Sequence, residues 1–285
     1  MEMRTVQESV ELRLWKKNAS LLLRDDEGEV LADLVRRVIL PASDPRLKQV
    51  GPLSRRLRAQ GDALLSSWHI TRKYTKAELA AAQLLHLSIT TTFEPAGEEC
   101  GTTYDDSTAC PVCKAGRKQI GDLRLNLTKI SNSKDIASSI ALVEWVVSER
   151  VAQLLKKEEV TGYELGRVVH SGRGSSVPPW HQLIITSRPV RVAATTRFGV
   201  NPFGDVPDDK AACPLGDTLG LNLLSEVHVR CESWDGSDFA RTQEFVGHRL
   251  GLLMPRPIVL ISPKLYRLLA QNGMRGYGVE AAYCE

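Results

Sequence analysis

The chain has 285 residues, 42% hydrophobic and 25% charged, and its 37 basic and 34 acidic side chains leave a net charge of +3. This composition is ordinary for a folded globular protein and excludes a disordered or fibrous chain. So small a net charge does not by itself indicate nucleic-acid binding, because an electrostatic footprint requires clustered basic side chains. No stretch approaches the roughly 18 apolar residues of a membrane span. The first residues carry no basic region followed by an apolar stretch, so we expect a cytoplasmic protein without a membrane anchor.

Residues 1–74 are expected to form an N-terminal α/β extension. Alternating apolar residues in 8–24 predict strands, and near-helical apolar spacing in 29–39 predicts a helix. Residues 44–74 are rich in arginine and lysine, with a helix expected from about Leu53 to Trp68. This basic segment has two interpretations, a nucleic-acid-binding face or a solvated amphipathic helix.

The next segment begins with a capping box, Thr75-Lys76-Ala77-Glu78, which opens a helix predicted to end near His86. A strand is expected over 87–93. Residues 94–119 then form a loop-rich insert, after which apolar alternation resumes at Leu123.

Two segments of the chain, Trp145–Leu155 and Val259–Leu269, align without a gap. Each predicts a buried strand, a helix capped by a serine and a returning strand that begins at a Gly-Tyr pair. The matched positions are Ser148 and Ser262 at the caps, then Gly162-Tyr163 and Gly276-Tyr277. We therefore predict an internal duplication, with a first module at 75–170, a linker at 171–180 and a second module at 181–285.

Cysteines provide the clearest candidate site. Cys110 and Cys113 have the spacing at which two thiolates bind one zinc ion, and Cys100 and Cys213 are the expected third and fourth ligands. His170, His181 and Asp217 are alternatives for the fourth position. Idle thiols and a redox pair are the other interpretations, although a redox motif usually lies at a helix N-terminus.

No catalytic motif is present in the sequence. It contains no Gly-x-Ser-x-Gly, no phosphate-binding Gly-x-x-x-x-Gly-Lys-Ser/Thr and no His-Glu-x-x-His. An active site assembled from distant residues remains an alternative, because catalytic side chains need not be adjacent in sequence. The loop 196–203 carries two phenylalanines and is interpreted either as a recognition surface or as a loop pinned to the core.

The combination of these motifs resembles a known family. Phe93-Glu94-Pro95, Cys100-Gly101 and Cys110-Pro111-Val112-Cys113, with Trp145-Val146-Val147-Ser148 and Gly162-Tyr163, are similar to bacterial proteins akin to the myxobacterial double-CxxCG immunity proteins. The resemblance covers roughly 75–170 and 205–283. It implies a protein partner, a cognate toxin encoded nearby. The chain departs from the family pattern, because Lys114 follows Cys113 and no cysteine stands at position 216.

The sequence thus predicts an α+β protein with two related strand–helix–strand modules, a small zinc-knuckle insert and an N-terminal α/β extension. We expect a non-enzymatic protein that binds a protein partner stoichiometrically, with a structural Zn²⁺ ion. Nucleic-acid binding through 44–74 and an enzyme with a spatially assembled site are the alternatives.

Overall fold

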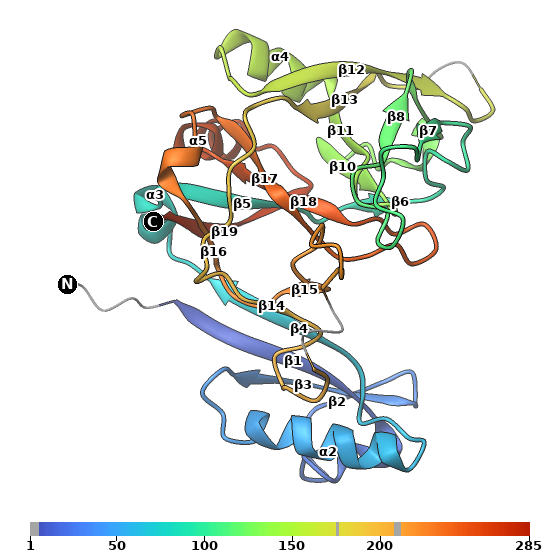
Figure 1. Cartoon of the computed structure of the whole chain (residues 1–285), viewed down its shortest axis with the longest axis vertical. Coiled ribbons are helices and arrows are strands. Elements are labelled where there is room, and N and C mark those ends of the chain that lie inside the picture. The colour runs from blue at the N-terminus through green and yellow to red at the C-terminus, as the bar shows by residue number, and fades with distance from the viewer. Residues whose placement is uncertain (1–5, 175–176, 208–211) are drawn as a thin grey trace.

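The α+β class is confirmed by the computed structural model, which describes residues 6–174, 177–207 and 212–285 (Figure 1). Three main sheets carry most of the chain, and the described residues contain five helices. No helix in these ranges is long and apolar enough to cross a membrane.

The N-terminal segment folds into a four-stranded antiparallel sheet in the order β2-β3-β1-β4, lying at the bottom of Figure 1 beneath the other two sheets. Val10, Leu12 and Leu14 alternate inward from β1 and pack with helix α2 in a separate core. The elements are β1 (Gln7–Trp15), α1 (Lys16–Ala19), β2 (Glu29–Leu31), β3 (Val35–Pro41), α2 (Leu47–Ala59) and β4 (Leu65–Lys73).

Three predictions for this segment are wrong. Strands were predicted across 8–24, but only Gln7–Trp15 is a strand, since Lys16–Ala19 form helix α1 and a turn follows. Residues 29–39 form the hairpin β2–β3 instead of a helix, because Ala32 and Asp33 adopt left-handed backbone and β3 pairs with β1. The basic helix ends at Ala59 instead of Trp68. Gly61, with φ of 75°, follows its end, and the residues beyond it become a strand of the sheet.

The second sheet has the order β6-β10-β11-β13-β12-β9, and helix α4 connects β11 to β12. Ser148 caps α4 as predicted, its hydroxyl accepting from the Val151 N–H. The elements are β6 (Thr92–Phe93), β9 (Leu123–Leu125), β10 (Ile136–Ser139), β11 (Trp145–Ser148), α4 (Glu149–Lys157), β12 (Tyr163–His170) and β13 (Trp180–Ile185).

The third sheet has the order β16-β19-β5-β18-β17, and helix α5 connects β18 to β19. Ser262 caps α5 with Pro263 at the first helical position, as predicted. The elements are α3 (Lys76–Ala81), β5 (Leu84–Ile89), β16 (Val227–Val229), β17 (Phe239–Val246), β18 (Arg256–Ile261), α5 (Pro263–Gln271) and β19 (Tyr277–Cys284). The capping box of Thr75 and Glu78 is formed, but α3 ends at Ala81, before the predicted His86.

The sheets do not follow the predicted module boundaries. Strand β5, from the segment 75–170, lies between β18 and β19 in the third sheet, as the teal arrow among orange and red strands in Figure 1 shows. Strand β13, from the segment 181–285 and the last residue of the predicted linker, lies between β11 and β12 in the second sheet. Each sheet thus receives its middle strand from the other side of the linker. Two of the linker's positions, 175 and 176, fall outside the described residues.

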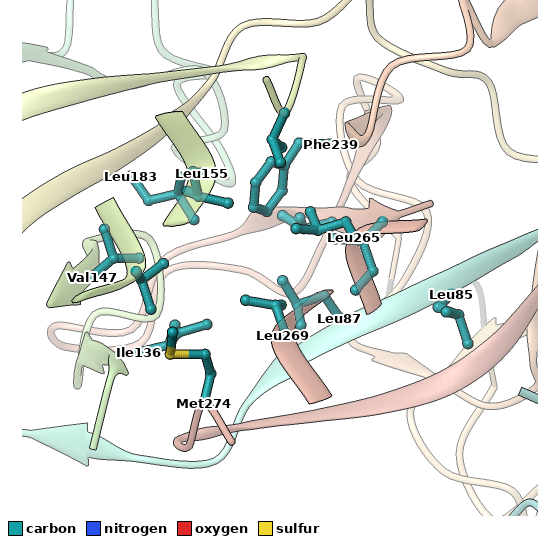
Figure 2. Packing of buried hydrophobic residues seen from close by; sticks show 14 of the residues in the cluster. Leu85, Leu87, Ile136, Val147, Leu155, Leu183, Phe239, Leu265, Leu269 and Met274 are labelled. Carbon is teal, nitrogen blue, oxygen red and sulfur yellow. The ribbon is translucent and has the colours of Figure 1, made fainter. Parts of the chain in front are cut away.

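A shared core joins the second and third sheets (Figure 2). Leu155 of α4 and both Leu265 and Leu269 of α5 are fully buried there. Figure 2 shows these leucines with Phe239, Leu183, Ile136 and Met274, side chains drawn from both sheets. Because the two helices bury their apolar faces on a common core, the sheets form one packed unit.

Reciprocal polar contacts cross the same boundary. Asp135, next to β10, accepts from the Ser148 hydroxyl (3.2 Å) and from the Arg275 N–H (3.0 Å). Asp238, next to β17, accepts from the Ser262 hydroxyl (2.7 Å) and from the Thr161 N–H (3.1 Å). Each buried carboxylate therefore holds its own helix cap and a backbone segment of the other sheet.

Candidate metal centre

A knuckle between two short strands carries the first pair of thiols. Strands β7 (Thr103–Asp105) and β8 (Lys118–Ile120) pair as a hairpin, and the turn between them holds Cys110 and Cys113. The knuckle is closed by a Cys110 N–H bond to the Ala115 carbonyl and by the Cys113 N–H, which lies 3.4 Å from the Cys110 sulfur. Both residues are buried, Cys110 with 6% and Cys113 with 4% of its surface exposed.

A second loop brings a third thiol to the knuckle from far along the chain. Cys213 is 7% exposed, and its backbone N–H donates to Thr218, while Gly216 donates back to the Cys213 carbonyl. This turn places the side chains of the two residues that flank it, Cys213 and Asp217, in the same cluster. Asp217, directly after Gly216, reaches the same cluster with its carboxylate.

Four side chains lie close enough together to hold one metal ion. One ligand atom from each of Cys110, Cys113, Cys213 and Asp217 lies within 4.8 Å of the others. The sulfurs of Cys110 and Cys213 are 3.6 Å apart, close to the roughly 3.8 Å between two thiolates on one zinc ion with bonds of about 2.3 Å. The Cys213 sulfur lies 4.0 Å from an Asp217 oxygen. All six cysteines are free, and 3.6 Å is far too long for a disulfide bond.

Electrostatics in the cluster favour a cation. Burial raises the pKa of the Cys113 thiol to about 12, and the neighbouring thiols add to this effect. At Cys213 burial again acts to raise the pKa, but backbone N–H groups of Leu215 and Asp217 and the other two thiols outweigh it, so the pKa is lowered. Adjacent thiolates repel one another, and a bound divalent cation would offset that repulsion.

The predicted ligands are thus only partly brought together. Cys110, Cys113 and Cys213 converge with Asp217, one of the alternatives for the fourth position, whereas Cys100 is not in the cluster. The other two alternatives have different partners: His170 Nδ1 accepts from the Leu127 N–H, and His181 Nε2 lies 2.6 Å from a Glu149 oxygen. The signal for Asp217 was its place after a Cys-Pro-Leu-Gly turn that resembles the first knuckle.

A buried carboxylate anchors the insert, and no sequence motif predicted it. Glu144 is 2% exposed and accepts from the Gly97 N–H (2.8 Å), the Tyr104 hydroxyl and the Ser139 hydroxyl. The guanidinium of Arg117 stacks on the Tyr104 ring at 4.3 Å and pairs with Glu98 at 2.8 Å. These contacts fix the knuckle hairpin against the edge of the second sheet.

A cavity of about 540 Å³ lies beside the metal cluster, between the second and third sheets. The knuckle forms one wall through Lys114, and Phe245, which packs against the cysteines, forms another. Strands β11, β13, β17 and β18 supply most of the remaining lining. A concave space of this size is typical of small-molecule sites.

The basic segment 44–74 has most of its arginines engaged. Arg46 pairs with Glu27 and Asp44, and Arg58 pairs with Asp205. Arg72 is 5% exposed and pairs with Glu8 and Glu280. The loop 196–203 is pinned here, because Phe203 packs edge-on against Trp68 with ring centroids 6.1 Å apart.

Comparison with known proteins gives no relative to argue from. No model of a protein family matches the chain, and no curated protein matches it.

Proposed function

We propose that the chain is a binding protein whose two halves are stapled by one structural zinc ion held by Cys110, Cys113, Cys213 and Asp217. The observation that carries the proposal is the convergence of three buried thiols and a carboxylate from loops about a hundred positions apart in the sequence. Three thiolates favour zinc over the harder cations, which prefer oxygen ligands. Four protein ligands leave no open coordination position, so the ion would stabilise the fold and would not activate water.

We infer that the second and third sheets arose by duplication of one strand–helix–strand unit. Support comes from the shared strand order around α4 and α5, with one exchanged strand inserted in each sheet. The matched Asp135–Ser148 and Asp238–Ser262 contacts give further support. Exchange of a middle strand between equivalent units is the arrangement expected of a fused, strand-swapped dimer.

We propose a protein as the partner, of the kind that an immunity protein neutralises. The support is the motif resemblance over 75–170 and 205–283, together with the closed ligand set of the metal centre. The pairing of Arg46, Arg58 and Arg72 with carboxylates lowers the weight of the nucleic-acid alternative, because the charge of each guanidinium is already balanced by a neighbouring carboxylate.

The metal part is tested by elemental analysis of the purified protein by plasma mass spectrometry. We expect one zinc per chain, lost in the variant Cys213→Ser, with an unfolding temperature lowered by several degrees because metal binding is linked to folding. Cys100→Ser is the matched control, since Cys100 lies outside the cluster and its loss should leave the zinc content at one. Retention of zinc by Cys213→Ser, or loss of zinc in Cys100→Ser, contradicts the assignment.

The partner part is tested by co-purification with tagged full-length protein from its own host, with and without nuclease. We expect one protein at a 1:1 ratio that survives nuclease treatment. Recovery of nucleic acid, with every protein partner lost after nuclease treatment, would favour the nucleic-acid alternative instead.

A further inference from the structure

The cavity beside the metal cluster carries more positive charge than its neighbours neutralise. Its lining includes Arg241 on β17 and Arg256 at the start of β18. In the described part of the chain no carboxylate pairs with either of them, whereas Arg117 in the same lining pairs with both Glu98 and Asp106. Two guanidiniums without carboxylate partners at one cavity repel each other, so an anion between them would stabilise both.

Arg241 has an unmet hydrogen-bonding group. Its Nε atom is buried and has no hydrogen-bond partner in the described ranges. A buried donor without a partner costs free energy that a ligand oxygen would recover. The residue stands at a β-bulge, where the register between β17 and β18 shifts after Arg241, and bulges commonly redirect side chains toward functional sites.

Arg256 is an exposed residue at the start of β18, and the protein atoms around its side chain remove part of its water. This desolvation lowers the pKa of Arg256 below the usual arginine range, yet a guanidinium remains a cation at neutral pH. Because the charge persists, Arg256 can donate charged hydrogen bonds to an anion in the cavity.

Two strained residues lie on the wall of the same cavity. Lys114 and Leu142 both have left-handed backbone, with φ of 64° and 63°, a conformation that disfavours side chains. Strain of this kind persists where the surrounding structure holds it and is enriched at ligand sites. At Lys114 the strained backbone places a further cation at the cavity, directly after the metal knuckle.

Much of the remaining lining is apolar, and the two carboxylates in it, Glu98 and Glu144, already have partners. Trp145, Leu183, Met254 and Phe245 contribute an aromatic and aliphatic surface to the same cavity. A bare inorganic anion would leave this surface without contacts. An anion with an apolar body would bury that surface and gain roughly 25 cal/mol per Å².

We propose that this cavity binds a small organic anion, a carboxylate or phosphate on an aromatic or aliphatic body, with its charged end on Arg241, Arg256 and Lys114. The volume of about 540 Å³ suits such a molecule, not a folded partner surface. The site is separate from the proposed partner-binding and zinc-holding functions, and its test does not require a partner protein.

The test uses the zinc-loaded full-length protein and three probes, 2-naphthoate, its uncharged analogue 2-naphthamide and inorganic phosphate, in isothermal titration calorimetry. We expect one 2-naphthoate per chain, with affinity at least about 10-fold above that of 2-naphthamide or phosphate, since one charged hydrogen-bonding pair contributes that much. Equal binding of naphthoate and naphthamide, or no naphthoate binding at millimolar concentration, overturns the proposal. Phosphate binding as tight as naphthoate binding overturns the amphipathic ligand class.

Variants locate the site. Arg241→Gln should weaken naphthoate about 10-fold or more, because its guanidinium is the buried group without a partner. The control Arg173→Gln removes one exposed positive charge elsewhere and should leave affinity unchanged. Equal effects of the two variants would mean that binding depends only on the net charge of the protein, and this would contradict the proposed site.

Lys114→Gly separates a ligand role from a structural one. Glycine tolerates φ of 64°, so the variant should unfold about 1–3 °C higher while naphthoate binds more weakly. If Lys114→Gly binds naphthoate as tightly as the parent protein, Lys114 has no part in the site. If the variant instead unfolds at a lower temperature, the Lys114 side chain stabilises the fold and its role is structural.

Discussion

At the scale of single residues, a histidine in the third sheet should make the stability of the folded protein depend on pH. His86 on β5 pairs across the sheet with Glu280, and its Nδ1 atom is buried without a hydrogen-bond partner in the described chain. Burial, together with the positive charges of Arg256 and Arg72, lowers the pKa of His86 to about 4. The imidazole therefore stays neutral in the folded protein under conditions in which the unfolded chain takes up a proton.

His86 predicts a loss of stability in mild acid. Between pH 6.5 and pH 4 the unfolded chain binds the proton and the folded chain does not, so stability falls as pH falls through this window. From pH 7 to pH 5 the loss from this residue is about 1–2 kcal/mol. His86→Gln removes the titrating group, and its guanidinium-chloride unfolding free energy should change less between these two pH values than that of the parent protein.

The comparison is made on the slope with pH, so a constant cost of the substitution does not affect it. Burial also raises the pKa of Glu280, but Glu280 is present in both proteins and its contribution cancels to first order. His248→Gln, at an exposed position, should leave the slope as it is. An unchanged slope in His86→Gln would mean that His86 is protonated in the folded protein at pH 5.

At the scale of elements, the turns after α4 and α5 set how closely the two sheets approach. Gly162 and Gly276 begin the returning strands with φ of 85° and 106°. A Cβ atom at Gly162 would lie 2.2 Å from the Phe239 carbonyl oxygen, and one at Gly276 would lie 2.0 Å from the Ile136 carbonyl oxygen. Only glycine permits this contact, in which the turn of each sheet abuts a strand of the other.

Gly162→Ala should therefore destabilise the protein through both backbone strain and a clash. Gly236 has the same φ of 85° with nothing within 4 Å of its Cβ position, so Gly236→Ala reports the conformational cost alone, about 1–2 kcal/mol. Gly162→Ala should cost about 2–3 kcal/mol more, because backbone must move. Chemical unfolding of the two variants measures the difference, and equal losses would show that the close approach relaxes without cost.

The helix caps and turns could be predicted from the sequence because they depend on local chemistry. The pairing between distant strands could not. Ser148 and Ser262 cap the helices as predicted because a serine hydroxyl before a helix satisfies an N–H of the first turn whatever the tertiary context. The apolar spacing of 29–39 fitted a helix equally well, and only pairing of β3 with β1 decided for strands.

The metal site shows the same division. The spacing of Cys110 and Cys113 identified the knuckle because both ligands lie on one turn. Cys100 was chosen for its nearness in sequence, whereas Asp217 enters the cluster through a loop that only the fold brings to the knuckle. The cavity cations Arg241 and Arg256 had no signal at all, because their lack of partners is a property of the packed structure.

At the scale of the whole molecule, the exchange of β5 and β13 means that the two predicted modules are segments of the sequence but are not separate units in space. The N-terminal piece of the chain supplies β5 to the third sheet, and the C-terminal piece supplies β13 to the second. In β5, Leu84, Leu85 and Leu87 are at most 1% exposed. Separating the pieces would expose these leucines and the core of Figure 2 at once.

Cutting the linker should therefore leave the molecule assembled. A protease recognition sequence inserted after Gly174, an exposed glycine with nothing within 4 Å of its Cβ position, allows the folded protein to be cut there. We expect both fragments to elute together from a size-exclusion column at the position of the uncut chain, because each completes a sheet of the other. Two modules joined only by a flexible linker would instead separate after cutting. Elution in 6 M guanidinium chloride, a concentration that unfolds all but hyperstable proteins, confirms that the chain was cut. Fragments that separate under native conditions would contradict the strand exchange. Fragments that stay together would show that the shared core and the exchanged strands hold the two pieces without the linker.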